Sequence, residues 1–169
     1  MKPDRLLFWT LAFWALAPAA FYAAGSWPAG AAEIVHENET GAVQSSCVRD
    51  DKTKRLICVA VYSKPPYLGF QLGSESDPES IAVTAGARRV PNSEIRIKVD
   101  NYAPHHVFGE GFAGKEAEAL RDEVEQGTTA TVSYEMQDEK EPSTGRIDLK
   151  DLKAALREIE SLRALDGGK

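Results

Sequence analysis

The sequence predicts a mainly β protein, a small β-sandwich or open barrel that also contains two helices, one mid-chain and one C-terminal. Three observations predict this class. Short runs of β-branched and aromatic residues recur at intervals of roughly 8–12 residues and are separated by turn-forming residues. Two segments, 115–126 and 149–165, carry apolar residues at helical spacing. The balance of 43% hydrophobic and 27% charged residues is typical of one globular domain.

The first 32 residues are predicted to be a signal peptide. Two basic residues near the start precede a charge-free stretch, Leu6–Ala32. Within it, Leu6–Ala17 is apolar, and Ala29-Gly30-Ala31 has the small-x-small pattern that precedes a signal-peptidase cleavage site. We therefore expect cleavage close to Glu33 and a mature protein that is periplasmic or secreted.

The alternative interpretation of this segment is an N-terminal anchor in the inner membrane, with the domain facing the periplasm. Leu6–Gly25 carries no charge and is long enough to cross a bilayer as a helix, although Pro18 interrupts it. The protein would then be an accessory subunit of an envelope complex. We expect membrane contact only if this segment is retained, because the net charge is −6. The same acidity gives no electrostatic reason to bind nucleic acid.

The remaining chain is predicted to form a single domain. Residues 33–41 are polar and are expected to be a flexible lead-in. The β-rich domain then covers residues 42–165, and residues 166–169 are expected to be a flexible tail.

The domain begins with a predicted hairpin that contains both cysteines. The β-prone runs 42–48 and 55–62 flank a charged turn at 51–54. This register places Cys47 directly opposite Cys58, within reach of a disulfide. Such a bridge closes a short loop and stabilises the fold by roughly 3 kcal/mol. We interpret it as structural, because redox pairs favour C-x-x-C spacing at the start of a helix.

Strands and two helices alternate through the rest of the domain. The clearest strand is 94–100, where Ile95, Ile97 and Val99 alternate with charged residues. A helix from Lys115 is expected to end at Gly127. The predicted strands after the hairpin are 67–72, 81–84, 94–100, 105–108, 128–136 and 145–149. The glycine-rich segment 109–114 is interpreted as a turn or bulge.

The order of these features resembles the bacterial invasion-associated locus B family of exported proteins, over about residues 42–165. The matching segments are Cys47–Cys58, Ile95–Asp100, Phe108–Gly114, the Leu120–Gly127 helix and Ile147–Leu156. The resemblance implies a periplasmic or surface β-rich domain without an established enzymatic activity. Many members carry a second cysteine pair near residues 102–114, where this chain has Phe108 and Phe112.

The sequence motifs do not indicate a catalytic site. The chain has no G-x-S-x-G motif and no zinc-type spacing of cysteine and histidine, so we predict a non-enzymatic protein without a cofactor. The alternative is a periplasmic metal-binding protein that uses His105 and His106. Adjacent histidines on a strand point to opposite faces, so such a site would also need His36 or Glu110.

We expect the protein to bind an unknown envelope protein through two aromatic segments, 62–70 and 102–112. The competing interpretation is that their aromatic residues and prolines pack in the core or protect a strand edge. The candidate interaction patch consists of Tyr62, Pro65, Pro66, Tyr67, Phe70, Tyr102, Phe108 and Phe112.

Overall fold

The computed structural model of this chain describes residues 32–73, 80–85, 89–109, 111–137 and 140–167. The predicted signal peptide, up to residue 31, and Glu110 lie outside the described residues. The helices are α1 (Lys115–Gln126) and α2 (Lys150–Gly167). The strands are β1 (Ala32–Thr40), β2 (Val43–Asp50), β3 (Leu56–Tyr62), β4 (Leu68–Leu72), β5 (Ile81–Ala85), β6 (Glu94–Val99), β7 (His105–Phe108), β8 (Phe112–Ala113), β9 (Thr129–Tyr134) and β10 (Ser143–Asp148).

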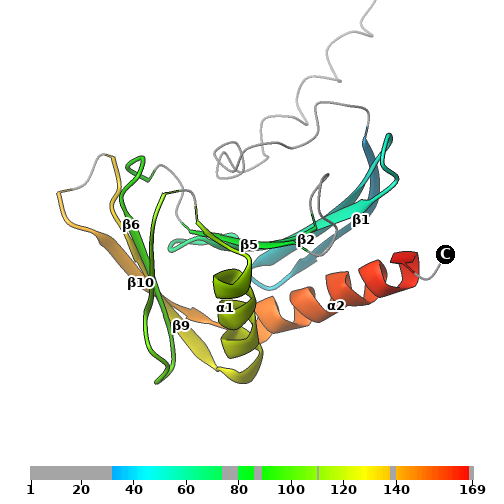
Figure 1. Cartoon of the computed structure of the whole chain (residues 1–169). Helices are drawn as coiled ribbons and strands as arrows, with labels where there is room; N and C mark the ends of the chain where they lie inside the picture. Colours follow the sequence, from blue (N-terminus) through cyan, green and yellow to red (C-terminus); the bar gives the residue numbers. More distant parts are fainter. Residues whose placement is uncertain (1–31, 74–79, 86–88, 110, 138–139, 168–169) are drawn as a thin grey trace, which may run out of the picture.

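The strands form two antiparallel sheets. The long sheet has the order β1-β2-β3-β4-β5-β8, and the short sheet has the order β10-β9-β6-β7. Figure 1 shows the long sheet curving over α2, with the short sheet at the other side of α1. The prediction of a mainly β protein with one helix in mid-chain and one at the C-terminal end is confirmed.

The predicted hairpin has the expected register. Cys47 pairs with Cys58 in the ladder between β2 and β3, and the amide of Asp50 donates to the carbonyl of Arg55 at 3.0 Å. The carboxylate of Asp50 stabilises the turn by accepting hydrogen bonds from the amides of Thr53, at 2.6 Å, and Lys52, at 3.1 Å. These bonds, led by that of Thr53, lower the pKa of Asp50.

One core lies between the two sheets and the two helices. The residues of α1 that face it are Ala117, Leu120 and Val124. The core-facing residues of α2 include Leu152, Leu156 and Ile159, which recur at helical spacing as the sequence predicts. This helix packs against β2 and β3, and α1 packs against β5, β6 and β8.

Two predictions about the ends of the domain are wrong. The expected flexible lead-in, residues 33–41, forms most of β1, which pairs along its length with β2. An edge strand is ordered by backbone hydrogen bonds to its neighbour, which any side chains allow. The polar sequence of β1 therefore gave no sign of a strand. The first two residues of the expected flexible tail belong to α2, which continues to Gly167, and Asp166 forms an ion pair with Arg49, while residues 168 and 169 lie outside the described residues.

The glycine-rich segment contains the short strand β8. Gly111 has a φ of 153°, and a Cβ at this position would overlap the backbone carbonyl of Val83. Glycine therefore allows the segment to approach β5 closely enough for Phe112 to pair with Val83. The interpretation of this segment as a turn or bulge missed β8, because a strand of two residues is too short to show an alternating pattern.

Candidate functional site

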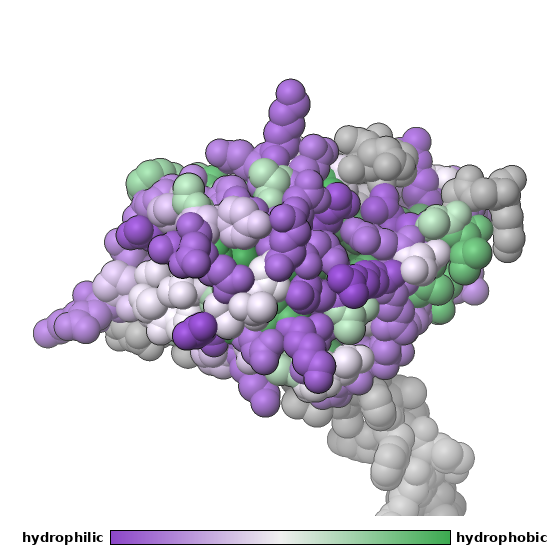
Figure 2. Space-filling view, turned by 90° about the horizontal axis from the view of Figure 1, so that it is seen from below, coloured by the Kyte–Doolittle hydropathy of each residue, from purple (hydrophilic) through white to green (hydrophobic). Residues whose placement is uncertain are grey.

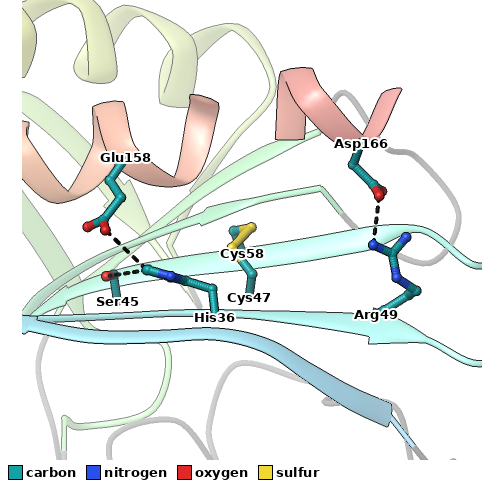
Figure 3. Close-up of a disulfide and its surroundings, with 7 residues drawn as sticks. All are labelled: His36, Ser45, Cys47, Arg49, Cys58, Glu158 and Asp166. Atoms are coloured by element: carbon teal, nitrogen blue, oxygen red, sulfur yellow. Dashed lines mark hydrogen bonds and ion pairs between the residues drawn. A yellow bond between two sulfur atoms is a disulfide. The ribbon is translucent and has the colours of Figure 1, made fainter. Parts of the chain in front are cut away.

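Cys47 and Cys58 form the predicted disulfide, on the face of the long sheet that α2 covers (Figure 3). Their Cα atoms are 4.1 Å apart. Such a short separation is typical of a non-hydrogen-bonded antiparallel pair. Both side chains are 0% exposed. Because thiol–disulfide exchange requires access to a sulfur atom, this burial favours a structural role over a redox role.

His36 lies between Ser45 and Glu158, and serine, histidine and a carboxylate are the three residue types of a hydrolase triad. Its Nε2 atom is 3.5 Å from Oγ of Ser45 and 3.7 Å from Oε1 of Glu158 (Figure 3). A triad needs the serine and the carboxylate on different ring nitrogens, whereas both groups here approach the same one. Ser45 is also only 3% exposed. This group therefore links β1, β2 and α2 and does not have the geometry of a nucleophile with its base.

His105 and His106 point to opposite faces of the short sheet, as their adjacent positions predict. Nε2 of His105 is 3.0 Å from Oε2 of Glu123 on α1, and the ring lies edge-on to Phe112. Within the described residues neither of these two atoms has a hydrogen-bond partner, so their contact is an ion pair when the imidazole is protonated. His106 instead contacts Glu94 on β6, with 2.6 Å between Nδ1 and Oε1.

The three histidines therefore do not converge on one site. Each has its own carboxylate partner, and these partners lie on three different elements: α2, α1 and β6. Among the described residues, no group of three or more His, Cys, Asp or Glu side chains is arranged to hold a metal ion. The fourth residue of the alternative metal site, Glu110, is outside the described part of the chain.

The predicted interaction patch is divided between the core and the surface. Phe70 and Phe112 are each 1% exposed and belong to the core. Pro66 is also buried, and a Cβ on Gly145 would overlap its ring. The prediction is wrong for these three residues. The inward positions of β4 and β8 hold Phe70 and Phe112, and Pro66 packs closely against Gly145 on β10. Tyr62 and Tyr67 are partly buried.

The exposed members of the patch lie on different elements, and only Phe108 lies on a strand of the short sheet. Phe108 is 73% exposed on β7, which is an edge strand, and His106 lies on the same face two residues earlier. Tyr102 is 39% exposed, and its hydroxyl donates to Oε1 of Gln126 at 3.1 Å. We call the surface formed by His106 and Phe108 the β7 edge, and Tyr102, in the turn before β7, is not part of it. Pro65 is exposed as well, in the loop between β3 and β4.

A polar depression of about 560 Å³ is lined by residues of β6, β9 and β10 and lies on the side of β6 away from β7. Its lining includes Lys98, Arg146 and Asp100. Oδ1 and Oδ2 of Asp100 accept hydrogen bonds from the amides of Thr129 (3.0 Å) and Thr128 (2.7 Å), and both threonine hydroxyls also donate. These bonds, led by that of the Thr128 amide, lower the pKa of Asp100 to about 2. Asp100 thus joins the end of β6 to the start of β9.

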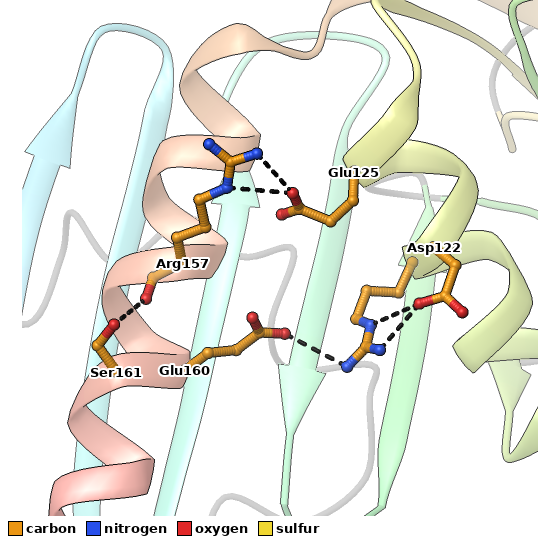
Figure 4. A network of polar contacts seen from close by, with 6 residues as sticks. Asp122, Glu125, Arg157, Glu160 and Ser161 are labelled. Atoms are coloured by element: carbon orange, nitrogen blue, oxygen red, sulfur yellow. Dashed lines mark hydrogen bonds and ion pairs between the residues drawn. The ribbon is translucent and has the colours of Figure 1, made fainter.

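The two helices are connected by ion pairs at the surface. Oε2 of Glu125 on α1 accepts two hydrogen bonds from Arg157 on α2, at 2.8 and 3.1 Å (Figure 4). Arg121 on α1 reaches Glu160 at 3.4 Å and Asp122 at 2.8 Å. The hydrogen bonds to Asp122 are the main cause of the raised pKa of Arg121. These contacts tie α1 to α2 and leave neither arginine as an isolated cation.

Sequence reasoning missed the carboxylate partners of the histidines and the role of Asp100. Glu94, Glu123 and Glu158 lie on surfaces that the sequence identifies only as polar. Asp100 had a usable signal, because an Asp-Asn pair directly after a strand is typical of a turn in which the side chain accepts backbone hydrogen bonds. Its partners, Thr128 and Thr129, are distant in sequence and had no such signal.

Comparisons with protein-family models, with curated proteins and with solved structures find no match to this chain. The resemblance to the invasion-associated locus B family therefore stays a prediction. Within the described residues, neither helix is long and apolar enough to cross a membrane.

Proposed function

We propose that this protein is exported and acts in the bacterial envelope through contacts with another protein, without catalysing a reaction, as the resemblance to the invasion-associated locus B family implies. The observation that carries export is the Cys47–Cys58 bridge, which is fully buried in the core. Structural disulfides persist in oxidising compartments such as the periplasm. The charge-free segment Leu6–Ala32 supports the same location.

The β7 edge is the contact surface that we propose for the partner. An edge strand has backbone N–H and C=O groups on its outer side that can pair with a strand of another protein. Phe108 adds a large aromatic side chain that is 73% exposed. Aromatic residues of this kind often provide much of the binding energy of an interface when a partner pocket covers them. The partner is therefore expected to offer an apolar pocket beside an extended segment.

Export is tested by the intact mass of the natively produced protein in the soluble and membrane fractions. We expect a soluble species that begins near Ala32 or Glu33 and gains the mass of a pair of hydrogen atoms on reduction. A full-length species in the membrane fraction would favour the anchored alternative. A product without a mass change on reduction would contradict export to an oxidising compartment.

The contact surface is tested by capturing partners from a periplasmic extract with the exported protein as bait. Phe108→Ala is compared with Leu165→Ala, because both side chains are 73% exposed and neither change removes core packing. We expect one discrete protein to bind the wild type and the Leu165→Ala variant but not the Phe108→Ala variant. Equal capture by both variants would show that the β7 edge is not the contact surface.

A further inference from the structure

The polar depression contains a row of three residues from three neighbouring strands. On the outer face of the short sheet, Thr131 of β9 pairs with Lys98 of β6 on one side and with Arg146 of β10 on the other. Residues that pair in a ladder point to the same face, so a short hydroxyl side chain lies between two long cationic ones. All three residues line the depression and are exposed. We call them the Thr131 row.

The two cations of the Thr131 row can reach the same point above Thr131. Adjacent strands are about 4.8 Å apart, so the Cα atoms of Lys98 and Arg146, with β9 between them, are roughly 10 Å apart. Each of these side chains is longer than half of that separation, whereas Thr131 is too short to block them. An ammonium, a guanidinium and a hydroxyl group can therefore bind one ligand group together.

Neither cation of the Thr131 row is neutralised within the described part of the chain. Lys98 has no hydrogen bond or ion pair there, and Arg146 donates a hydrogen bond from Nη2 to Oγ1 of Thr129 at 3.2 Å. Carboxylates outnumber cations in this chain, with 26 Asp and Glu against 20 Lys and Arg, so unpaired cations are unexpected. Three other arginines each contact a carboxylate at 2.7 or 2.8 Å: Arg49, Arg121 and Arg157.

The carboxylate in the lining of the depression is engaged elsewhere. Asp100 lies two positions beyond Lys98, and its two oxygens accept hydrogen bonds from the amides and hydroxyls of Thr128 and Thr129. Among the described residues, Asp100 forms no ion pair with Lys98 or Arg146. The Thr131 row is therefore left with two positive charges and without a partner of the opposite sign.

We propose that the Thr131 row binds the phosphate group of a small, soluble phosphate monoester. Arginine binds phosphate through paired N–H groups and lysine binds it as a point charge. A phosphate monoester also has three acceptor oxygens, which match donors from three strands. A carboxylate has only two oxygens and would leave one donor of the row without an acceptor.

The rest of the depression indicates what the phosphate is attached to. Its described lining has no aromatic or aliphatic side chain, and Figure 2 shows that the surface seen from below is mostly hydrophilic. The exposed side chains of Asn101 and Thr128 lie in the same lining and can form hydrogen bonds with hydroxyl groups. We therefore expect a hydroxylated ester, such as a sugar phosphate or glycerol phosphate. The β7 edge lies on the other side of β6, so this inference does not depend on the proposed protein partner.

The experiment titrates the isotopically labelled protein, as exported, and follows its backbone amides by NMR at constant ionic strength. The probes are glycerol 3-phosphate, inorganic phosphate and acetate. We expect saturable shifts of the amides of Lys98, Thr131 and Arg146 with both phosphates, and at least tenfold weaker binding of acetate. Equal binding of acetate, or no saturable shift with either phosphate, would overturn the proposal. Vesicles of phosphatidic acid also present a phosphate monoester, and tighter binding to them would overturn the assignment to a soluble ester.

The variants test whether the phosphate binds at the row or is attracted by positive charge in general. Lys98→Gln and Arg146→Gln should each weaken the binding of glycerol 3-phosphate by about tenfold, because each removes a charge-assisted hydrogen bond. Arg146→Lys should recover part of the loss. The matched control is Lys115→Gln, the same change at the exposed start of α1, whose 12 residues span roughly 18 Å. The control should bind within about twofold of the wild type, because salt screens a charge at that distance.

Circular dichroism establishes that each variant is folded. Equal weakening by Lys98→Gln and Lys115→Gln would overturn the proposed site, and so would undiminished binding in both Lys98→Gln and Arg146→Gln.

Discussion

Arg49 on β2 and Asp166 in the last turn of α2 form an ion pair, with 2.7 Å between Nη2 and Oδ1. The hydrogen bond to Asp166 is the main cause of the raised pKa of Arg49. At the other end of the helix, Nζ of Lys153 donates to the carbonyl of Gly127 at 2.7 Å. The C-terminal helix is thus attached to the rest of the domain near both of its ends, and residue 166 belongs to the fold.

The disulfide should contribute substantially to stability. We expect the double variant Cys47→Ala/Cys58→Ala to lose about 2–4 kcal/mol of unfolding free energy, because the bridge restricts the unfolded chain. Urea unfolding followed by circular dichroism measures the loss. A reductant reaches the buried bridge when the chain unfolds, so it should destabilise the wild type by a similar amount. It should leave the stability of the double variant unchanged. An unchanged midpoint in the double variant would show that the surrounding core suffices.

Asp100 should make the protein sensitive to acid in a defined range. Its pKa is about 2 in the folded protein, below the ordinary value of 3.8. Because the pKa of Asp100 is lower in the folded than in the unfolded protein, its contribution to the unfolding free energy is fully present above the unfolded pKa. That contribution is lost as the pH falls from about 4 towards 2. Asp100→Asn should therefore lower stability at neutral pH and flatten the acid limb of the stability curve.

The control for this prediction is Asp51→Asn, since Asp51 is an exposed turn residue. Thermal unfolding between pH 2 and pH 7 compares the variants. The Asp100→Asn curve should keep some slope, because Asp50 also has a lowered pKa. A curve identical to that of the wild type would show that the threonine bonds do not stabilise the ionised carboxylate.

Two neighbouring residues of α2 should differ greatly in their contribution to stability. Leu156 is 0% exposed, and Leu156→Ala should cost about 2–5 kcal/mol because it leaves a cavity in the core. Arg157→Ala removes the ion pair with Glu125. Because the side chain of Arg157 is 66% exposed, this change should lower the unfolding free energy by only about 0.2–1 kcal/mol. Chemical unfolding at low and high salt checks both values, and salt should reduce the effect of the second change alone.

The two phenylalanines of the predicted patch should behave in opposite ways. Phe112→Ala should cost about 3–5 kcal/mol, since its side chain is 1% exposed in the core. Phe108→Ala should change the unfolding free energy by less than about 0.5 kcal/mol, because its side chain is largely exposed. Denaturation midpoints measure both changes. A large loss in Phe108→Ala would mean that this residue supports the fold rather than a contact surface.

Local sequence patterns determined most of the elements. Alternation in 94–100 and helical spacing in 149–165 predicted β6 and α2, and the turn between the cysteines predicted their register. These features depend on interactions between residues that are close in sequence, such as a tight turn or one face of a helix. Predicted and observed strand bounds differ by no more than two residues in the strands that were expected.

The tertiary structure decided which residues are available for function. The sequence does not distinguish Phe108 from Phe112, yet the pairing of β8 with β5 buries one and the edge position of β7 exposes the other. The sequence also predicted a flexible segment where β1 forms, because an edge strand is ordered by its hydrogen-bonded ladder with the neighbouring strand and not by its own residues. The carboxylate partners of the three histidines follow from contacts between different elements of the fold. Composition alone records the mean charge of a chain, whereas folding determines where that charge is placed.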